Sequence, residues 1–145
     1  MRVMRVEIVR FTPEDIPEAL ELWRQSEGMG LFGETPELLA SCLERNPGLS
    51  SVARDGGTLV GAVLCTHDGR RGYLQHLAVA RSHRRRGIGG LLVAACVAGL
   101  ERLGLPRCHL FVQRGNDEAV AFWTRAGWSR RTDLVMMSRT LARES

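Results

Sequence analysis

The chain has 145 residues, 44% of them apolar, which is enough for one folded domain with a hydrophobic core. Its formal net charge of +4 favours an anionic ligand or partner, and all twenty basic residues are arginine, which excludes Schiff-base chemistry on lysine and a lysine-dependent phosphate loop. The N-terminal residues lack the apolar core of a signal peptide and no run has the length of a membrane span, so we expect a single cytoplasmic domain over residues 1–145 with no membrane partner.

The first part of the chain predicts one strand and two helices. Residues 6–11 favour a strand, and residues 12–13 form a helix-start signal of threonine followed by proline. The apolar spacing that follows predicts an amphipathic helix ending before a glycine-rich, apolar loop at residues 28–33. The same signal at residues 35–36 starts a second predicted helix, which ends near residue 46.

Three strands follow, and their short turns predict an antiparallel meander. Residues 51–54 and 59–66 favour two strands joined by a hairpin turn at residues 55–57. A second turn at residues 68–72 leads into a central strand over residues 73–79.

The last part predicts two helices with a strand between them. A long helix runs from Ile88 and stops at Gly104, and a strand at residues 109–112 should pair in parallel with the preceding strand because a helix separates them. Asn116 caps a further helix, and residues 128–141 should hold one or two last strands. This order of elements predicts an α+β fold with a sheet of mixed direction.

Each of the four cysteines lies alone in an apolar segment, without the paired spacing of a metal site. They predict buried, reduced thiols and no metal cofactor, with a disulfide as the alternative. These residues are Cys42, Cys65, Cys96 and Cys108.

A basic, glycine-rich turn separates the predicted central strand from the long helix. Glycines let a backbone approach a ligand closely, and the start of a helix offers unpaired N–H groups and the positive end of a dipole. We therefore predict a phosphate or pyrophosphate site, rather than a solvated basic turn. The positively charged residues around it are Arg81, His83, Arg84, Arg85 and Arg86.

Two familiar phosphate motifs do not fit this turn. A dinucleotide-binding fingerprint needs a third glycine where Leu92 stands and an acidic residue after the next strand, where Gln113 and Arg114 stand. A phosphate loop of the lysine type is excluded by composition. The sequence from Arg84 to Gly89 instead matches the pattern R-x-x-G-x-G.

This motif follows the strand Leu77-Ala78-Val79 and precedes a segment at residues 116–128 that is similar to N-x-x-A-x-x-F-Y-x-x-x-G-F. On these motifs the chain resembles the GNAT superfamily of N-acetyltransferases over almost its whole length. Within that superfamily it resembles small bacterial enzymes of the ribosomal-protein-alanine acetyltransferase type. The resemblance implies a mostly antiparallel central sheet that is splayed at the middle and flanked by about four helices. It also implies acetyl-CoA as co-substrate.

The resemblance further implies how the co-substrate is held. Main-chain N–H groups of residues 86–90 would cradle the pyrophosphate, and Leu77 and Val79 would pair with the pantetheine arm like an added strand. The N–H of Val79 would polarise the thioester carbonyl, in a gap opened by a bulge in this strand. The implied cofactor-binding residues are Leu77, Val79, Arg81, Arg84, Arg85, Arg86, Gly87, Ile88, Gly89, Gly90, Asn116, Phe122 and Trp123.

The proton donor to the leaving thiolate cannot be taken over from the family. Its usual tyrosine is Trp123 here, and an indole N–H is not a useful acid. We expect the thiolate to leave unaided or through water, with Tyr73 or Cys108 as substitutes for the tyrosine. Core packing is the other interpretation of Phe122 and Trp123, because they lie at helical spacing.

Two residues are candidates for the base that deprotonates the amine. His76 lies in the central strand near the splay, and histidine is a residue type suited to proton transfer; the other interpretation is a packed sheet residue satisfied by hydrogen bonds. Glu27 follows the first helix and could act through water, with a solvated helix-end acid as the alternative.

The predicted function is acetyl transfer from acetyl-CoA to a primary amine, on a small molecule or at a protein N-terminus, by direct attack in a ternary complex. Glu27 and Glu34 point weakly to a cationic acceptor. The alternatives are a non-catalytic acyl-CoA sensor and a basic nucleic-acid-binding domain. The basic run of this chain has no interleaved aromatic residues and no known recognition motif, so we expect no nucleic acid as partner. The oligomeric state stays open, with a homodimer as the candidate assembly.

Overall fold

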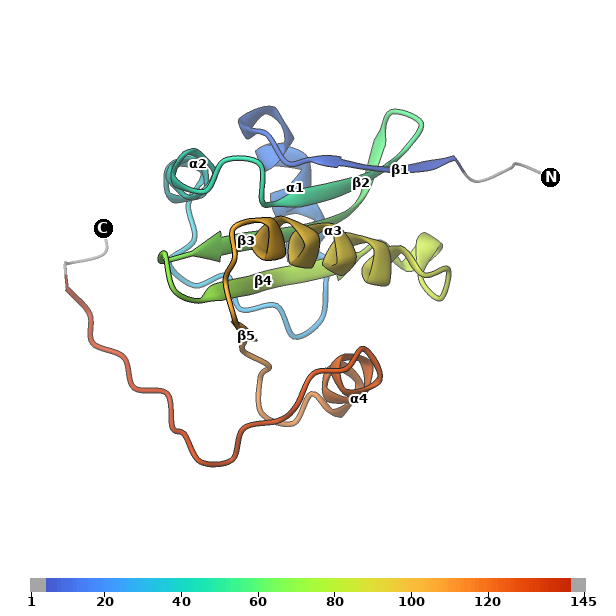
Figure 1. Cartoon of the computed structure of the whole chain (residues 1–145). Coiled ribbons are helices and arrows are strands. Elements are labelled where there is room, and N and C mark those ends of the chain that lie inside the picture. The colour runs from blue at the N-terminus through green and yellow to red at the C-terminus, as the bar shows by residue number, and fades with distance from the viewer. Residues whose placement is uncertain (1–4, 142–145) are drawn as a thin grey trace. The chain divides into compact units, whose positions relative to one another are not determined.

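The computed structural model describes residues 5–141, and the chain forms two compact units, Met1–Phe111 and Val112–Ser145 (Figure 1). Within the described residues, the first unit carries a five-stranded sheet with helices α1 to α3, and the second carries helix α4. The α+β class predicted from the sequence is confirmed. A single domain over the whole chain stays a prediction.

Both predicted helix starts in the first unit are confirmed by their caps. The backbone N–H of Thr12 donates to Oδ2 of Asp15 at 2.9 Å, and Oγ1 of Thr35 accepts from the backbone N–H of Leu38 at 3.1 Å. These bonds satisfy donors that a helix end leaves without intrahelical partners. The elements concerned are strand β1 (Val6–Arg10), the 3-10 turn η1 (Pro13–Asp15), helix α1 (Ile16–Arg24) and helix α2 (Pro36–Arg45).

The sheet follows the chain in the order β1-β2-β3-β4-β5. The first three pairings are antiparallel, and β4 pairs with β5 in parallel, so the predicted meander and parallel crossover are confirmed. Strand β5 is shorter than predicted. The remaining elements of this unit are β2 (Ser51–Asp55), β3 (Thr58–His67), β4 (Gly72–Val79), helix α3 (Ile88–Arg102) and β5 (Cys108–Leu110).

Helices cover both faces of this sheet. Ala62 and Leu64 of β3 belong to one core cluster with residues of α1 and α2, including the fully buried Trp23. On the other face, a Cβ added to Gly61 would lie 2.9 Å from the side chain of Leu92 in α3, so the lack of a side chain lets α3 approach closely. Figure 1 shows α3 lying across β3 and β4.

Strand β4 contains a bulge that reverses which residues face each helix layer. Leu64 pairs with Gln75 and Ala62 pairs with Ala78, so β4 has one residue more than β3 between these pairs. In a regular strand Leu74 and Ala78 would share a face. Here Leu74 pairs with Cys65, which faces α3, while Ala78 belongs to the core under α1 and α2.

The second unit contains one described helix, α4 (Asp117–Arg125), capped by Asn116, whose Oδ1 accepts from the backbone N–H of Ala119 at 3.1 Å. The predicted last strands are wrong: residues 128–141 are all described and form no strand. A strand needs a neighbouring strand to take its N–H and C=O groups, and none is present in the described residues of this unit.

No helix of residues 5–141 has both the length and the apolar character that crossing a membrane requires.

Candidate functional site

The pairing of β4 with β5 stops half-way along β4. The last paired residues are Leu74 and Leu110, and β4 continues to Val79 with no described strand on that side. The five residues from 75 to 79 therefore leave an open strand edge. This confirms the predicted splay of the central sheet.

The backbone of Val79 faces this open edge. The N–H of Ala80 donates to the carbonyl of Val60 in β3 at 2.8 Å, so the preceding N–H, that of Val79, points to the opposite side. The carbonyl of Val79 accepts from Nε of Arg84 at 3.0 Å, which agrees with this direction. A chain laid along the edge would thus find the N–H of Val79 available as a donor.

A glycine-rich loop connects this strand end to α3. Gly87 precedes the helix with φ +80°, a conformation that favours glycine, and its carbonyl accepts the N–H of Leu91 at 3.1 Å. The N–H groups of the first helical turn have no intrahelical acceptor, and they lie beside the positive end of the helix dipole. The side chain of Ile88 is buried, so this residue offers the loop only its backbone.

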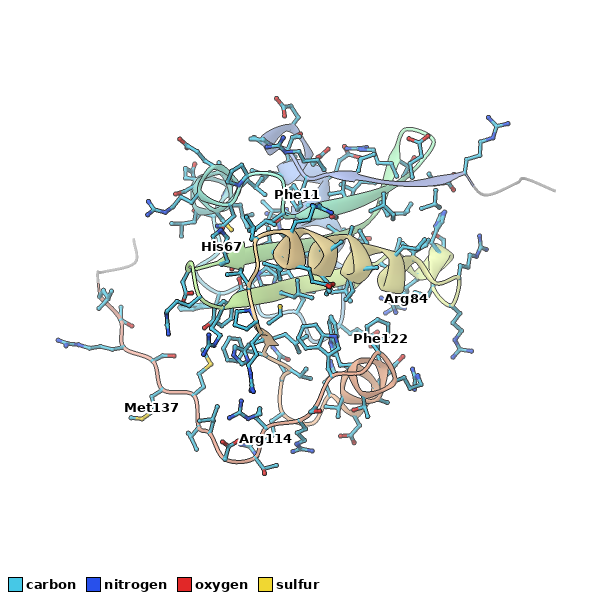
Figure 2. All side chains as sticks on the ribbon, in the orientation of Figure 1. Phe11, His67, Arg84, Arg114, Phe122 and Met137 are labelled. Atoms are coloured by element: carbon cyan, nitrogen blue, oxygen red, sulfur yellow. The ribbon has the colours of Figure 1, made fainter. Side chains whose placement is uncertain are left out.

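The arginines of the loop are exposed to solvent, and Arg84 is labelled in Figure 2 near the start of α3. The guanidinium of Arg81 contacts the carboxylate of Glu27, and both side chains are well exposed. Such a surface pair contributes little to stability, so it can be exchanged for contact with an anion at little cost. Glu27 thus lies beside the loop, as a partner of an arginine.

A buried carboxylate fixes the start of this loop. Nε2 of His83 lies 2.8 Å from Oδ2 of Asp55, whose Oδ1 accepts the N–H of Arg5 at 3.2 Å. The side chain of Asp55 is only 5% exposed, and Nδ1 of His83 lies 2.7 Å from Oγ of Ser82. The short 3-10 turn η2 (Arg81–His83) is therefore tied to the end of β2.

The bulge presents His76 to the face covered by α1. His76 has φ +58°, and its ring centroid lies 5.1 Å from that of Trp23. Its Nε2 lies 2.7 Å from Oε2 of Glu34, which belongs to the loop between α1 and α2. His76 is thus hydrogen-bonded, and it lies in the part of β4 where the sheet opens.

Tyr73 and Cys108 lie in the closed part of the sheet. Tyr73 pairs with His109, and the two rings are 5.8 Å apart. Tyr73 and Val79 are six positions apart, which is about 20 Å along a strand. This placement favours a packing role for Tyr73 over proton donation near Val79.

All four cysteines are free thiols, and burial raises the pKa of Cys108 to about 11, with a smaller contribution from Cys96. Cys108 should therefore stay protonated at pH 8, where an unperturbed thiol with a pKa of about 8.5 is partly ionised. We expect iodoacetamide to modify Cys108 at pH 8 at least about tenfold more slowly in the folded protein than in urea. Peptide mass mapping measures this, and equal rates in both conditions would contradict the raised pKa.

Three predicted cofactor residues lie in the second unit, where Asn116 caps α4. The ring centroid of Trp123 lies 5.1 Å from that of Phe122 and 5.2 Å from that of Trp128, and both pairs pack edge to face. The indole at position 123 thus belongs to an aromatic cluster. The cofactor contacts of these residues stay predictions.

Residues 16–128 match the model of the acetyltransferase (GNAT) family. The chain belongs to this family. GNAT acetyltransferases use acetyl-CoA. The R-x-x-G-x-G motif lies in the glycine-rich loop that follows the open edge of β4. The co-substrate of this GNAT protein is therefore acetyl-CoA.

Known GNAT proteins resemble this chain over nearly its full length. Acetyltransferase SG1711 of Sodalis glossinidius is 25% identical over 136 residues, covering 94% of this chain and 96% of the relative. The ribosomal-protein-S18-alanine N-acetyltransferase of Escherichia coli superposes with a TM-score of 0.75 at 21% identity, covering 88% of this chain and 80% of that one. The PaiA N-acetyltransferase of Thermoplasma acidophilum, solved with coenzyme A, gives 0.74 at 20% identity, covering 85% and 89%.

Two contacts of this GNAT site were not foreseen from its sequence. Sequence reasoning assigned neither the pairing of Glu34 with His76 nor that of Asp55 with His83. Each joins residues far apart in the chain, 42 and 28 positions respectively, and depends on how strands and loops meet. No local signal identifies either pair, because His76 lies in the middle of the predicted central strand and His83 lies in the basic turn.

Proposed function

We propose that this protein transfers the acetyl group of acetyl-CoA to a primary amine, on a small molecule or at a protein N-terminus. The observation that carries the proposal is the open edge of β4 from residue 75 to Val79, which ends beside the glycine-rich start of α3. The proposed donor to the thioester and the proposed seat for the diphosphate would thus lie on adjoining segments of one chain.

The proposed cofactor contacts follow this arrangement. Backbone N–H groups of residues 86–90 hold the pyrophosphate, and exposed guanidinium groups beside them add charge-assisted hydrogen bonds. Leu77 and Val79 pair with the pantetheine arm as an added strand would. The N–H of Val79 then stabilises the negative charge that develops on the thioester oxygen.

The proposed reaction is direct attack in a ternary complex, to which the protein contributes chiefly by holding the two substrates together. His76 is the proposed base, because it lies in the opened part of β4, three positions before Val79, and histidine is a residue type that can accept a proton. Glu27 is the second candidate, acting through water. The thiolate leaves unaided or through water.

The proposed acceptor binds near the loop between α1 and α2. Phe32 in this loop is 93% exposed, and an aromatic ring held in water is suited to cover a bound ligand. The Escherichia coli neighbour, named for the alanine of ribosomal protein S18, supports a protein N-terminus as one acceptor class. The acidic side chains of Glu27 and Glu34 would suit an amine that arrives as a cation.

A thiol-release assay tests the proposal. With acetyl-CoA and a panel of primary amines that includes short peptides with free N-termini, we expect amine-dependent release of coenzyme A. Thermal-shift measurements with coenzyme A accompany it and should show stabilisation at saturating concentration. The absence of any stabilisation by coenzyme A would contradict the proposal.

A non-catalytic acyl-CoA sensor is the second candidate, favoured by one observation. Trp123 stands where the family has its proton-donating tyrosine, and its indole is packed between two other rings. A sensor would be stabilised by coenzyme A and release no thiol with any amine. The two measurements together therefore separate the candidates.

A further inference from the structure

We propose that Glu34 is a positioning residue for His76, holding the imidazole in the orientation and tautomer that a base for the amine needs; this rests on the proposed acetyl transfer. Oε2 of Glu34 lies 2.7 Å from Nε2 of His76. The histidine side chain is 17% exposed and the glutamate side chain 24%, so the contact is largely shielded from water. It joins the α1–α2 loop to the opened part of β4.

The bulge in β4 is what makes this contact possible. Without the extra residue, position 76 would face the α3 side of the sheet together with Leu74. With it, His76 takes φ +58° and packs against Trp23 of α1. A left-handed conformation is uncommon for a residue other than glycine, and such backbone strain gathers at functional positions.

Each side chain of the pair is supported by its surroundings. Trp23 is fully buried against the His76 ring, so the ring has a fixed wall. The N–H of Glu34 donates to the carbonyl of Leu31 at 3.0 Å, and the next residue, Thr35, caps α2. Glu34 is therefore held between a turn and a helix start, as a positioning carboxylate requires.

The hydrogen bond also determines which ring nitrogen is available. A carboxylate only accepts, so Nε2 of His76 carries the hydrogen and the neutral ring has its lone pair on Nδ1. Nδ1 has no hydrogen-bond partner among residues 5–141. After proton uptake, the nearby carboxylate stabilises the imidazolium, as in other carboxylate–histidine pairs.

The reaction step is balanced in protons and bonds. An ammonium acceptor gives one proton to Nδ1 of His76, and the free amine attacks the thioester carbon. The C–N bond forms, the C–S bond breaks, and the electron pair leaves on the sulfur of coenzyme A. The second proton lost by the nitrogen passes to this sulfur, and His76 releases its proton to solvent.

A double-mutant cycle on kcat tests the proposal, using the amine that gives the fastest thiol release. His76→Asn is the suitable histidine variant because asparagine tolerates the left-handed backbone. We expect H76N to lower kcat by about 100-fold or more and E34A by about tenfold, with unchanged KM for acetyl-CoA. In the H76N background, E34A should lower kcat by less than about twofold.

The matched control is Glu37→Ala, which removes an exposed acid three residues away in the first turn of α2. Equal losses from E34A in both backgrounds, a loss no larger than that of E37A, or an unaffected H76N enzyme would each overturn the positioning role while leaving acetyl transfer intact. A wild-type protein that binds coenzyme A but acetylates no amine would overturn both proposals. Melting temperatures of all variants check that each remains folded.

Discussion

Replacing Gly87 with valine should weaken the binding of coenzyme A by about 100-fold or more, which corresponds to roughly 2.7 kcal/mol. Gly87 has φ +80° at the start of α3, a conformation that a β-branched residue adopts only with strain of about 1–3 kcal/mol. Relief of this strain would turn the first N–H groups of the helix away from a common point. Titration calorimetry with coenzyme A measures the loss directly.

Gly104 provides the matched control at the other end of the same helix. It has φ +76°, and like Gly87 it has no atom within 4 Å of an added Cβ. Gly104→Val should therefore lower the melting temperature about as much as Gly87→Val while leaving coenzyme A binding unchanged. Equal affinities in the two variants would show that the diphosphate does not bind at the start of α3.

Replacing His83 with alanine should reduce both stability and coenzyme A affinity. The variant would leave the carboxylate of Asp55, which is only 5% exposed, without its histidine partner. Removing one partner from such a buried pair costs about 3 kcal/mol, or roughly 10 °C in melting temperature for a domain of this size. Because η2 would lose its tie to β2, we expect coenzyme A affinity to fall about fivefold or more, although His83 itself is not a proposed ligand contact.

His67→Ala is the control for this prediction. Nδ1 of His67 accepts the N–H of Gly69 in an exposed turn, at 3.0 Å, so the loss of this bond should cost less than about 1 kcal/mol. Differential scanning fluorimetry and calorimetry on both variants give the comparison. If H83A were as stable and bound coenzyme A as tightly as H67A, the pair with Asp55 would have no role in holding the loop.

The features that the sequence predicted well are those that local chemistry decides. Thr35 and Asn116 were expected to cap helices, and both accept the backbone N–H that a cap should accept. The hairpin turn after Asp55 and the parallel pairing of β5 follow from glycine placement and from the helix between two strands. The glycine-rich turn before α3 was predictable for the same reason, because its glycines and arginines are contiguous, and its binding of a diphosphate stays a prediction.

The features that could not be predicted depend on contacts between distant segments. The bulge in β4 decides which face of the sheet carries the side chain of His76. A histidine at φ +58° has no signal in the sequence. The partner of His76 comes from a loop 42 residues earlier. Residues 128–141 were predicted to form strands because of their apolar residues. A strand also needs a neighbouring strand to pair with, and the described part of the second unit has none.

A crystal structure with coenzyme A bound would test the central claim most directly. The account predicts that the diphosphate lies against the backbone N–H groups of residues 86–90, with the pantetheine arm along Leu77 to Val79 and its sulfur beside the open edge of β4. A diphosphate bound elsewhere, or an arm that does not contact this edge, would contradict it.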